Sequence, residues 1–302
     1  MTAPDSALRA EIAERAAAHG LDVDAETMRT VEAGLDYRVA FASAEDGTEW
    51  VLRIPRRADV SEKVADEARI LGLVRDRLPA AVPDWRISGP DLIAYPRLPG
   101  EPGLTLSTDG EPQWHFDRED PHYARSFGRL IAHLHGIGAE DARAAGVSVR
   151  TADEERAEWR ARLERASAAF AISDGLRASW EVWLDDDGLW PEFTALTHGE
   201  LYPAHLLLDS DGEVRSVLDW TTAKVGDPAV DFMYHHMLSG PEAFRLAVEA
   251  YAELTGRVPR RLGERCEALL SAGPLSYAEY ALTTGDPEHA AAAQAQLTPT
   301  DA

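Results

Sequence analysis

The spacing of apolar residues changes along this chain at a stretch rich in proline and glycine, residues 96–103. Before it, residues 37–42 and 50–54 alternate apolar and polar side chains around an Asp-Gly turn, a pattern typical of a β-hairpin. After it, apolar residues recur mostly at helical spacing. We therefore predict an α+β fold with a small antiparallel-sheet lobe over residues 1–97 and a larger, mostly helical lobe over residues 98–302.

The same two periodicities predict the remaining elements. Helices are expected at roughly 6–19, 60–78, 120–138, 150–171, 174–186, 240–256 and 260–283, and short strands at 84–87 and 92–95. A second hairpin, formed by residues 206–208 and 214–218 around Ser210-Asp211-Gly212, interrupts the helical part. The tail after Ala290 is expected to fray.

The net charge of the chain limits the classes of partner that it can bind. Thirty basic and fifty-three acidic residues give a net charge of -23, which repels nucleic acid and anionic membranes and favours a cationic ligand, or simply keeps the surface solvated. A single cysteine excludes an internal disulfide and a cysteine-based zinc cluster. No signal-like or membrane-spanning apolar run is present, so we expect a cytoplasmic protein, acting as a monomer.

The second hairpin carries the residues that suggest chemistry. A polar loop from His198 to His205 leads into its first strand, and Asp219 ends its second strand. Antiparallel pairing brings His205 and Asp219 together, and Glu200 projects from the loop near both. Phosphoryl transfer needs a metal ion on the phosphates and a carboxylate for the proton of the attacking hydroxyl. Each signal alone is weak, and a purely structural role for the set is the alternative.

Residues 197–232 resemble the catalytic core of antibiotic kinases, most closely the macrolide 2'-phosphotransferases. The most specific stretches are 218–225, Leu-Asp-Trp-Thr-Thr-Ala-Lys-Val, and 227–231, Asp-Pro-Ala-Val-Asp, and further matches follow in order over nearly the whole chain. The resemblance implies a two-lobed protein-kinase-like fold. It also implies transfer of the γ-phosphoryl of GTP, with ATP as the alternative donor and with Mg²⁺, to the 2'-hydroxyl of a macrolide amino sugar, which confers antibiotic resistance.

The resemblance also assigns roles in the catalytic loop. Glu200 stands where the family has the Asp that accepts the proton, His205 and Asp219 stand at the metal-ligand positions, and Asp231 anchors the loop. The extra methylene of Glu200 moves the carboxylate outward, and a displacement of ~1 Å can cost on the order of 10²-fold in rate. This departure keeps a nucleotide-binding pseudokinase open as an alternative. Asp227 is either a functional acid or a turn or cap residue.

In the first lobe, Arg53 stands where kinases place a phosphate-binding Lys, and Glu67 stands where they place its acidic partner. An ordinary surface pair is the alternative for these two. The stretch that contains Gly34 and Tyr37 takes the place of a glycine-rich loop. The inter-lobe hinge includes Ile93, Tyr95 and Arg97. These seven residues are the predicted nucleotide site.

The acceptor implied by the resemblance is a large apolar ring with a cationic sugar. Candidate contacts are Tyr202, Met237, Ala272, Leu275 and Tyr280, although each of them could instead pack in the core. His133 and His135 are expected to pack and form hydrogen bonds rather than to catalyse. A kinase for an aminoglycoside or a choline-like metabolite stays open as a further alternative, but a polycation would need a cleft lined by many acids.

Overall fold

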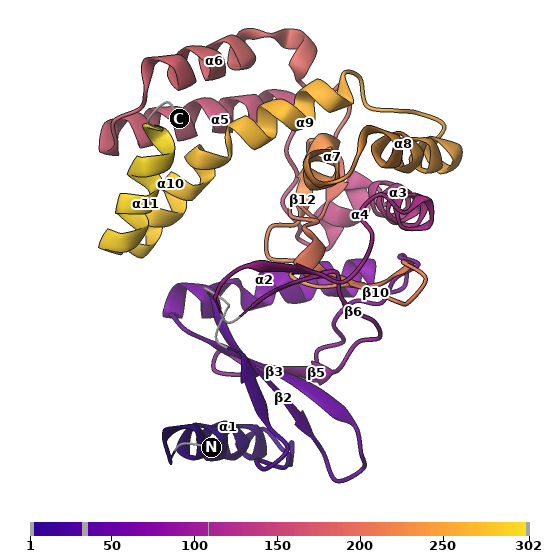
Figure 1. Ribbon diagram of the computed structural model, residues 1–302, viewed down its shortest axis with the longest axis vertical. Helices are drawn as coiled ribbons and strands as arrows, with labels where there is room; N and C mark the ends of the chain where they lie inside the picture. The colour runs from indigo at the N-terminus through magenta and orange to yellow at the C-terminus, as the bar shows by residue number, and fades with distance from the viewer. Residues whose placement is uncertain (1–2, 32–35, 108, 300–302) are drawn as a thin grey trace. The chain divides into compact units, whose positions relative to one another are not determined.

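The chain divides into two compact units, each built from separate segments. The computed structural model describes residues 3–31, 36–107 and 109–299. Unit 1 comprises Met1–Asp117, Ala144–Val147 and Pro203–Ala223, and unit 2 comprises Arg118–Arg143, Ser148–Tyr202 and Lys224–Ala302. Unit 1 includes residues after 97, among them β6 (Glu101–Pro102), which shares one sheet with the second hairpin (Figure 1).

Unit 1 contains a five-stranded antiparallel sheet. Its order is β1 (Arg29–Val31), β2 (Tyr37–Ser43), β3 (Glu49–Pro55), β5 (Ile93–Pro96) and β4 (Ile87–Ser88). The hairpin of β2 and β3 turns where predicted, and Gly47 adopts the positive φ of 82° that the turn requires. Strand β4 is shorter than expected and begins only at Ile87.

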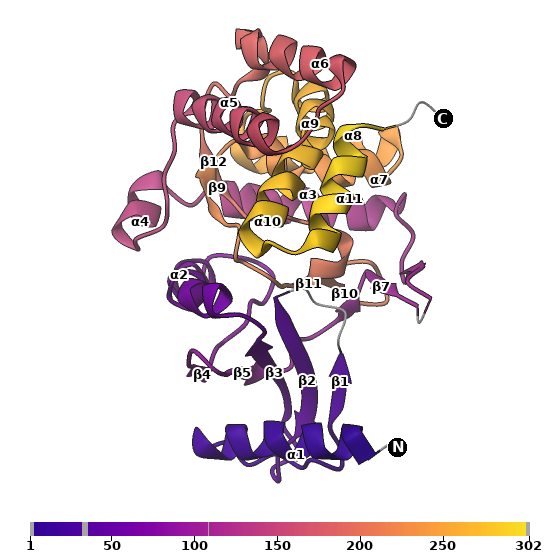
Figure 2. The same ribbon diagram turned by 90° about the vertical axis from the view of Figure 1, so that its left-hand side faces the viewer.

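A helix covers each face of this sheet. Residues Ile12 and Ala16 of α1 (Ala3–Ala18) pack against Leu52 of β3. Figure 2 shows α1 lying beside β2 and β3. On the other face, α2 (Ala58–Val74) packs through Val60 and Val64 against Val51, Ile93 and Tyr95. The neighbours Val51 and Leu52 thus face opposite helices, because side chains alternate along a strand.

The second hairpin forms a smaller sheet in unit 1. Its strands β11 (Val214–Val217) and β10 (Leu206–Leu208) are those predicted, and β10 also pairs with β6 (Glu101–Pro102). The 3₁₀ turn η2 (Pro203–His205) precedes β10, and Gly212 has a φ of 81° at the hairpin turn. A separate ribbon is made by β7 (Leu104–Leu106) and β8 (Pro112–Trp114).

Unit 2 is mostly helical. Its helices are α3 (Pro121–His135), α4 (Ala139–Ala144, whose last residue falls in unit 1), α5 (Ala152–Ala169), α6 (Asp174–Asp185), α7 (Met233–Leu238), α8 (Pro241–Thr255), α9 (Leu262–Ser271), α10 (Gly273–Thr284) and α11 (Pro287–Leu297). The 3₁₀ turns η1 (Asp187–Leu189) and η3 (Pro228–Asp231) and the ribbon of β9 (Ala195–Thr197) and β12 (Lys224–Gly226) complete it. Helices α3 and α8 approach closely at Gly128, where a Cβ would lie 2.1 Å from the Ala247 oxygen.

Two expectations about the end of the chain are wrong. The tail after Ala290 is helical to Leu297, because α11 folds back on α10 and buries Leu297 completely. The single helix expected over residues 260–283 is broken at Ala272, where α10 begins with a Gly-Pro pair. Within the described ranges, no helix has the length and apolar character that crossing a bilayer requires.

Candidate active site

The loop that contains Glu200 begins where β9 ends, and Asp231 holds its first residues. Both oxygens of the Asp231 carboxylate take part. Oδ2 accepts a hydrogen bond from the His198 backbone N–H at 3.0 Å, and Oδ1 accepts one from the Gly199 N–H at 2.8 Å. Gly199 has a φ of 90°, a conformation that strongly favours glycine. Asp231 has no exposed surface, so this acid fixes the path of the loop from inside unit 2.

A second chain of hydrogen bonds supports Asp231 from behind. His135 Nε2 lies 3.1 Å from Asp231 Oδ2, and His135 Nδ1 lies 3.3 Å from the Tyr251 hydroxyl. If Nε2 carries the proton and donates to Asp231, Nδ1 accepts from Tyr251. His135 therefore packs and hydrogen-bonds as expected. Tyr251 was missed, because nothing in the sequence links α8 to this loop.

Glu200 is half-buried in unit 2 and is held through its backbone. Its N–H donates to His198 Nδ1 at 3.2 Å, and its carbonyl accepts from the Tyr202 N–H at 2.7 Å. Burial, followed by the negative charge of Glu200, raises the pKa of Tyr234 to about 12. Tyr202 meets the Tyr234 ring edge-on at 5.2 Å between centroids. Tyr202 and Tyr234 therefore both lie close to Glu200. Of these two, only Tyr202 was predicted from the sequence as a site residue.

His205 and Asp219 lie together in unit 1, as the hairpin predicted. His205 Nε2 is 3.8 Å from Asp219 Oδ2, and the Leu218 N–H donates to the His205 carbonyl at 2.8 Å. Asp219 has a φ of 59°, a left-handed conformation that few residues other than glycine adopt and that is common at functional sites. Its Oδ1 accepts from the Thr221 hydroxyl at 2.6 Å. The predicted proximity of Glu200, which belongs to unit 2, stays a prediction.

The donor set at Asp219 fits one kind of metal ion. In the described part of the chain, no three His, Cys, Asp or Glu side chains gather closely enough to form a protein-only metal cage. Mg²⁺ does not need one, because it is usually bound by one or two carboxylates together with water and substrate phosphates. The oxygen donors of Asp219 match this preference better than the His205 nitrogen does.

Arg53 and Glu67 form a buried pair in unit 1. Arg53 Nη1 donates to Glu67 Oε1 at 2.9 Å, and the exposed fractions of the two residues are 8% and 1%, so the alternative of a surface pair is wrong. The guanidinium also lies 4.0 Å from the centre of the Tyr37 ring. Burial raises the pKa of Glu67, while Arg53 opposes the shift. A guanidinium held on two sides presents its remaining donors in a fixed direction.

The other predicted nucleotide contacts lie on or after β5 or fall outside the description. Ile93 and Tyr95 are buried in β5, and burial raises the pKa of Tyr95 to about 12. Arg97 pairs with Glu49 and Glu101 near the surface. Gly34 lies outside the described residues. The hinge role of this segment therefore rests on the resemblance rather than on a contact within unit 1.

The predicted acceptor contacts do not share one environment. Ala272 and Leu275 have no exposed surface and pack in the interior of unit 2, which is the core role that was left open for them. Met237 is 51% exposed on α7, and Tyr280 is half-buried, with its ring centroid 4.9 Å from that of His289. Helical periodicity places a residue on the apolar face of its helix. It does not show whether that face packs in a core or lines a ligand cleft.

Asp227 is a cap residue. Its carboxylate accepts from the Ala229 N–H at 2.8 Å, which starts the 3₁₀ turn η3, and it forms an ion pair with the buried Arg265. Burial raises the pKa of Asp227, and Arg265 opposes that shift. The pair ties η3 to α9, and η3 ends at Asp231, so Asp227 contributes to the support behind the loop.

Known proteins share this architecture. The model of a phosphotransferase enzyme family matches residues 27–265. The crystal structure of macrolide 2'-phosphotransferase MphH from Brachybacterium faecium is 51% identical, covers 97% of this chain and 98% of its own, and has a TM-score of 0.90. A macrolide 2'-phosphotransferase type I is 37% identical, covers 100% and 99% of the two chains, and has a TM-score of 0.90. The uncharacterized protein YcbJ of Bacillus subtilis (strain 168) is 36% identical over 92% of both chains.

Proposed function

Because this chain belongs to the phosphotransferase enzyme family, we propose that it transfers the γ-phosphoryl of GTP to the 2'-hydroxyl of a macrolide amino sugar and so confers macrolide resistance. The observation that carries the proposal is the 51% identity to a macrolide 2'-phosphotransferase over nearly the full length of both chains. Structures of aminoglycoside phosphotransferases in complex with GDP are 17–18% identical and support the fold alone.

Glu200 is the group that we assign to the proton of the acceptor hydroxyl. Its carboxylate is half-buried, and Asp231 fixes the backbone that precedes it through the His198 and Gly199 amides. Such support matters because a general base must hold its oxygen within hydrogen-bond reach of the proton that it removes. The longer side chain of Glu relative to Asp is compatible with this role if the loop backbone lies correspondingly further from the acceptor hydroxyl.

Arg53 is the group that we assign to the nucleotide phosphates. Glu67 and the Tyr37 ring hold the guanidinium in place, and its planar array of N–H donors suits phosphate oxygens. Asp219, assisted by His205, would hold Mg²⁺, which supplies positive charge against the phosphates when it is bound. The preference for GTP over ATP depends on backbone groups of the hinge and follows from the family resemblance.

A nucleotide-binding protein without kinase activity is the second candidate, and one observation favours it. Glu200 stands where the resemblance calls for Asp, so the base is one methylene longer than in the family. If that length misplaces the carboxylate by ~1 Å, the rate falls on the order of 10²-fold. The two candidates therefore differ in turnover and not in nucleotide binding.

Kinetics with GTP, Mg²⁺ and erythromycin separate the two candidates. We expect turnover by the wild type, and for Glu200→Ala a fall in kcat of about 10²- to 10⁴-fold with the KM for GTP unchanged. Glu181→Ala, which removes an exposed acid on α6 of the same unit, serves as the matched control and should retain full activity. Equal activity of Glu200→Ala and wild type would remove Glu200 from the mechanism.

A panel of macrolides completes the test. Tight GTP binding without turnover of any macrolide would favour the non-catalytic candidate. Phosphorylation of aminoglycosides instead of macrolides would replace the proposed acceptor while leaving the phosphotransferase chemistry in place.

A further inference from the structure

The ribbon of β9 and β12 carries the chain into the loop that contains Glu200. The two strands pair antiparallel, with Thr197 opposite Lys224, and the Thr197 hydroxyl donates to the Lys224 carbonyl at 3.0 Å. Thr197 is the last residue of β9, so the next residues are His198, Gly199 and Glu200. Whatever fixes Lys224 therefore also fixes the point from which the loop departs.

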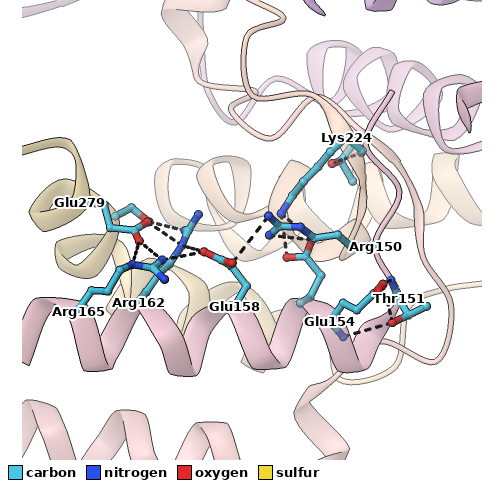
Figure 3. Close-up of polar contacts among 11 residues, drawn as sticks. Arg150, Thr151, Glu154, Glu158, Arg162, Arg165, Lys224 and Glu279 are labelled. Carbon is cyan, nitrogen blue, oxygen red and sulfur yellow. Dashed lines mark hydrogen bonds and ion pairs between the residues drawn. The ribbon is translucent and has the colours of Figure 1, made fainter. Parts of the chain in front are cut away.

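The side chain of Lys224 is tied to the first turns of α5. Its Nζ lies 2.6 Å from Glu155 Oε1 and 2.8 Å from Glu155 Oε2, so that one amine serves both oxygens. The Glu155 side chain is only 5% exposed, and Lys224 is 26% exposed. Arg150 Nη1 stands 4.0 Å from Glu155 Oε1 as a second, more distant cation. Figure 3 shows Arg150 near the end of the Lys224 side chain. Removal of the Lys224 amine would leave the buried Glu155 carboxylate without its nearest cation, which destabilises the folded state.

Backbone contacts make β12 a rigid base for this pair. The Val225 N–H donates to the Ser148 carbonyl at 2.8 Å, and the Arg150 N–H donates to the Val225 carbonyl at 3.0 Å. Residues 148–150 thus flank β12 on the side opposite β9. At Thr151 a reciprocal capping arrangement with Glu154 starts α5, which fixes where Glu155 points. Helix, ribbon and flanking segment meet at Glu155.

Gly226 shows how closely the carboxylate lies against the ribbon. A Cβ at this position would stand 2.8 Å from Glu155 Oε1, which is nearer than such atoms approach. The atom that it would meet is the end of a flexible side chain, so an alanine there displaces the carboxylate without a clash against backbone. The absence of a side chain at Gly226 therefore leaves room for Glu155 to reach Lys224.

We propose that Lys224 and Glu155 are positioning residues for the loop that contains Glu200, acting through the β9–β12 ribbon. Neither residue touches the reacting atoms in this proposal. Their ion pair fixes the position of Thr197 at the end of β9, and this position in turn determines where the Glu200 carboxylate lies. The inference rests on the proposed function only for the role of Glu200, since the coupling between the pair and the loop is a property of unit 2.

The same helix provides a matched control. Arg162, further along α5, pairs with Glu279 of α10 at 2.9 Å, and its side chain is 24% exposed, close to the 26% of Lys224 (Figure 3). Arg162 pairs α5 with another helix and not with the ribbon. Arg162→Met removes a cation of similar exposure from Glu279, a carboxylate that is 24% exposed and that Arg165 also pairs. It therefore tests the loss of an α5 ion pair away from the ribbon, whereas Lys224→Met removes the nearest cation from Glu155.

The kinetic test compares kcat with KM in these variants. We expect Lys224→Met to lower kcat by about ten- to a hundredfold with both KM values unchanged, and Arg162→Met to leave kcat unchanged. Lys224→Arg should recover part of the loss, because a guanidinium can also serve both carboxylate oxygens. Gly226→Ala should reproduce the loss with every charge retained. A normal kcat in Gly226→Ala, or equal losses in Lys224→Met and Arg162→Met, would overturn the proposal.

Hydrogen–deuterium exchange gives a readout that needs no substrate. Amides of residues 197–201 should exchange faster in Lys224→Met and Gly226→Ala than in wild type, and at the wild-type rate in Arg162→Met. Unchanged exchange in the first two variants would overturn the inference even if the enzyme is active. If the wild type phosphorylates no macrolide, the proposed function fails, and the exchange data alone decide the role of the pair.

Discussion

Glu67 in unit 1 and Asp231 in unit 2 are both buried acids, but their surroundings differ. Asp231 accepts from two backbone amides and lies 3.1 Å from a ring nitrogen of His135. Glu67 accepts from one side chain, Arg53, and its Oε2 is buried without a hydrogen bond of normal geometry, although the nearby Trp220 backbone favours its charged form. One acid is held by backbone amides, and the other by a side chain.

The difference matches the roles that we propose for the two regions, a proton acceptor on the Glu200 loop and a phosphate contact at Arg53. A loop that delivers a proton acceptor benefits from backbone hydrogen bonds, because these cannot swing away. An arginine that takes hold of a nucleotide must accept new partners when the nucleotide arrives and release them afterwards. A single carboxylate and an aromatic face hold Arg53 without occupying all of its donors.

The largest effect should come from removing the fixed acid. Asp231→Ala leaves the His198 and Gly199 amides and His135 without their common partner inside unit 2. We expect a loss of about 3–5 kcal/mol in the free energy of unfolding, measured by urea denaturation, together with loss of turnover. Asp231→Asn keeps one acceptor oxygen and should lose less. A loss below about 1 kcal/mol in Asp231→Ala would contradict the comparison, since that is the size of one ordinary hydrogen bond.

A smaller effect concerns the response of unit 2 to acid. Burial lowers the pKa of His235 to about 4, from 6.5 in the unfolded chain, so between these values the unfolded state binds more protons than the folded state. This group therefore contributes stability that is present above pH 6.5 and lost as the pH falls towards 4, by about 3 kcal/mol in total. His235→Gln should flatten the fall when free energies of unfolding are measured from pH 7 to pH 4. Parallel curves for the two proteins would show that His235 does not drive it.

The smallest effect should have the opposite sign, in unit 1. Burial raises the pKa of Glu67 above its ordinary value of 4.5, against the opposing charge of Arg53. Stability from this group is greatest below pH 4.5 and is lost as the pH rises through the raised value. On acidification from pH 7, the wild type should thus gain stability relative to Glu67→Gln. A wild type that loses stability relative to Glu67→Gln over this range would show that Arg53 outweighs burial.

The sequence predicted correctly those elements that are determined by neighbouring residues, above all the two β-hairpins. Asp-Gly turns at residues 46–47 and 211–212 gave both hairpins, because a glycine with positive φ defines the turn and the alternation of apolar residues defines the strands. The second hairpin was enough to place His205 beside Asp219. The family resemblance supplied Asp231 as the anchor of the loop.

The remaining features depend on contacts between distant residues. Tyr251 reaches the loop through His135, and Lys224 meets Glu155 across 69 positions, so no local pattern indicates either contact. Ala272 and Leu275 have the spacing of a helix face whether that face meets a core or a ligand, and the structure buries them. The pairing of β6 with β10, which groups residues 203–223 with unit 1, also joins residues that are far apart in the sequence.

Synthesis on the ribosome delivers the strands of unit 1 at widely separated times. Strand β6 at Glu101–Pro102 pairs with Leu207 and Leu208 of β10, so its partner appears only after helices α3 to α6 have been made. Such distant pairing slows folding and leaves a strand edge uncovered in the meantime. A nascent chain that has reached Asp117 therefore still lacks β10 and β11, and presents an unfinished sheet that we expect chaperones to recognise rather than a completed unit 1.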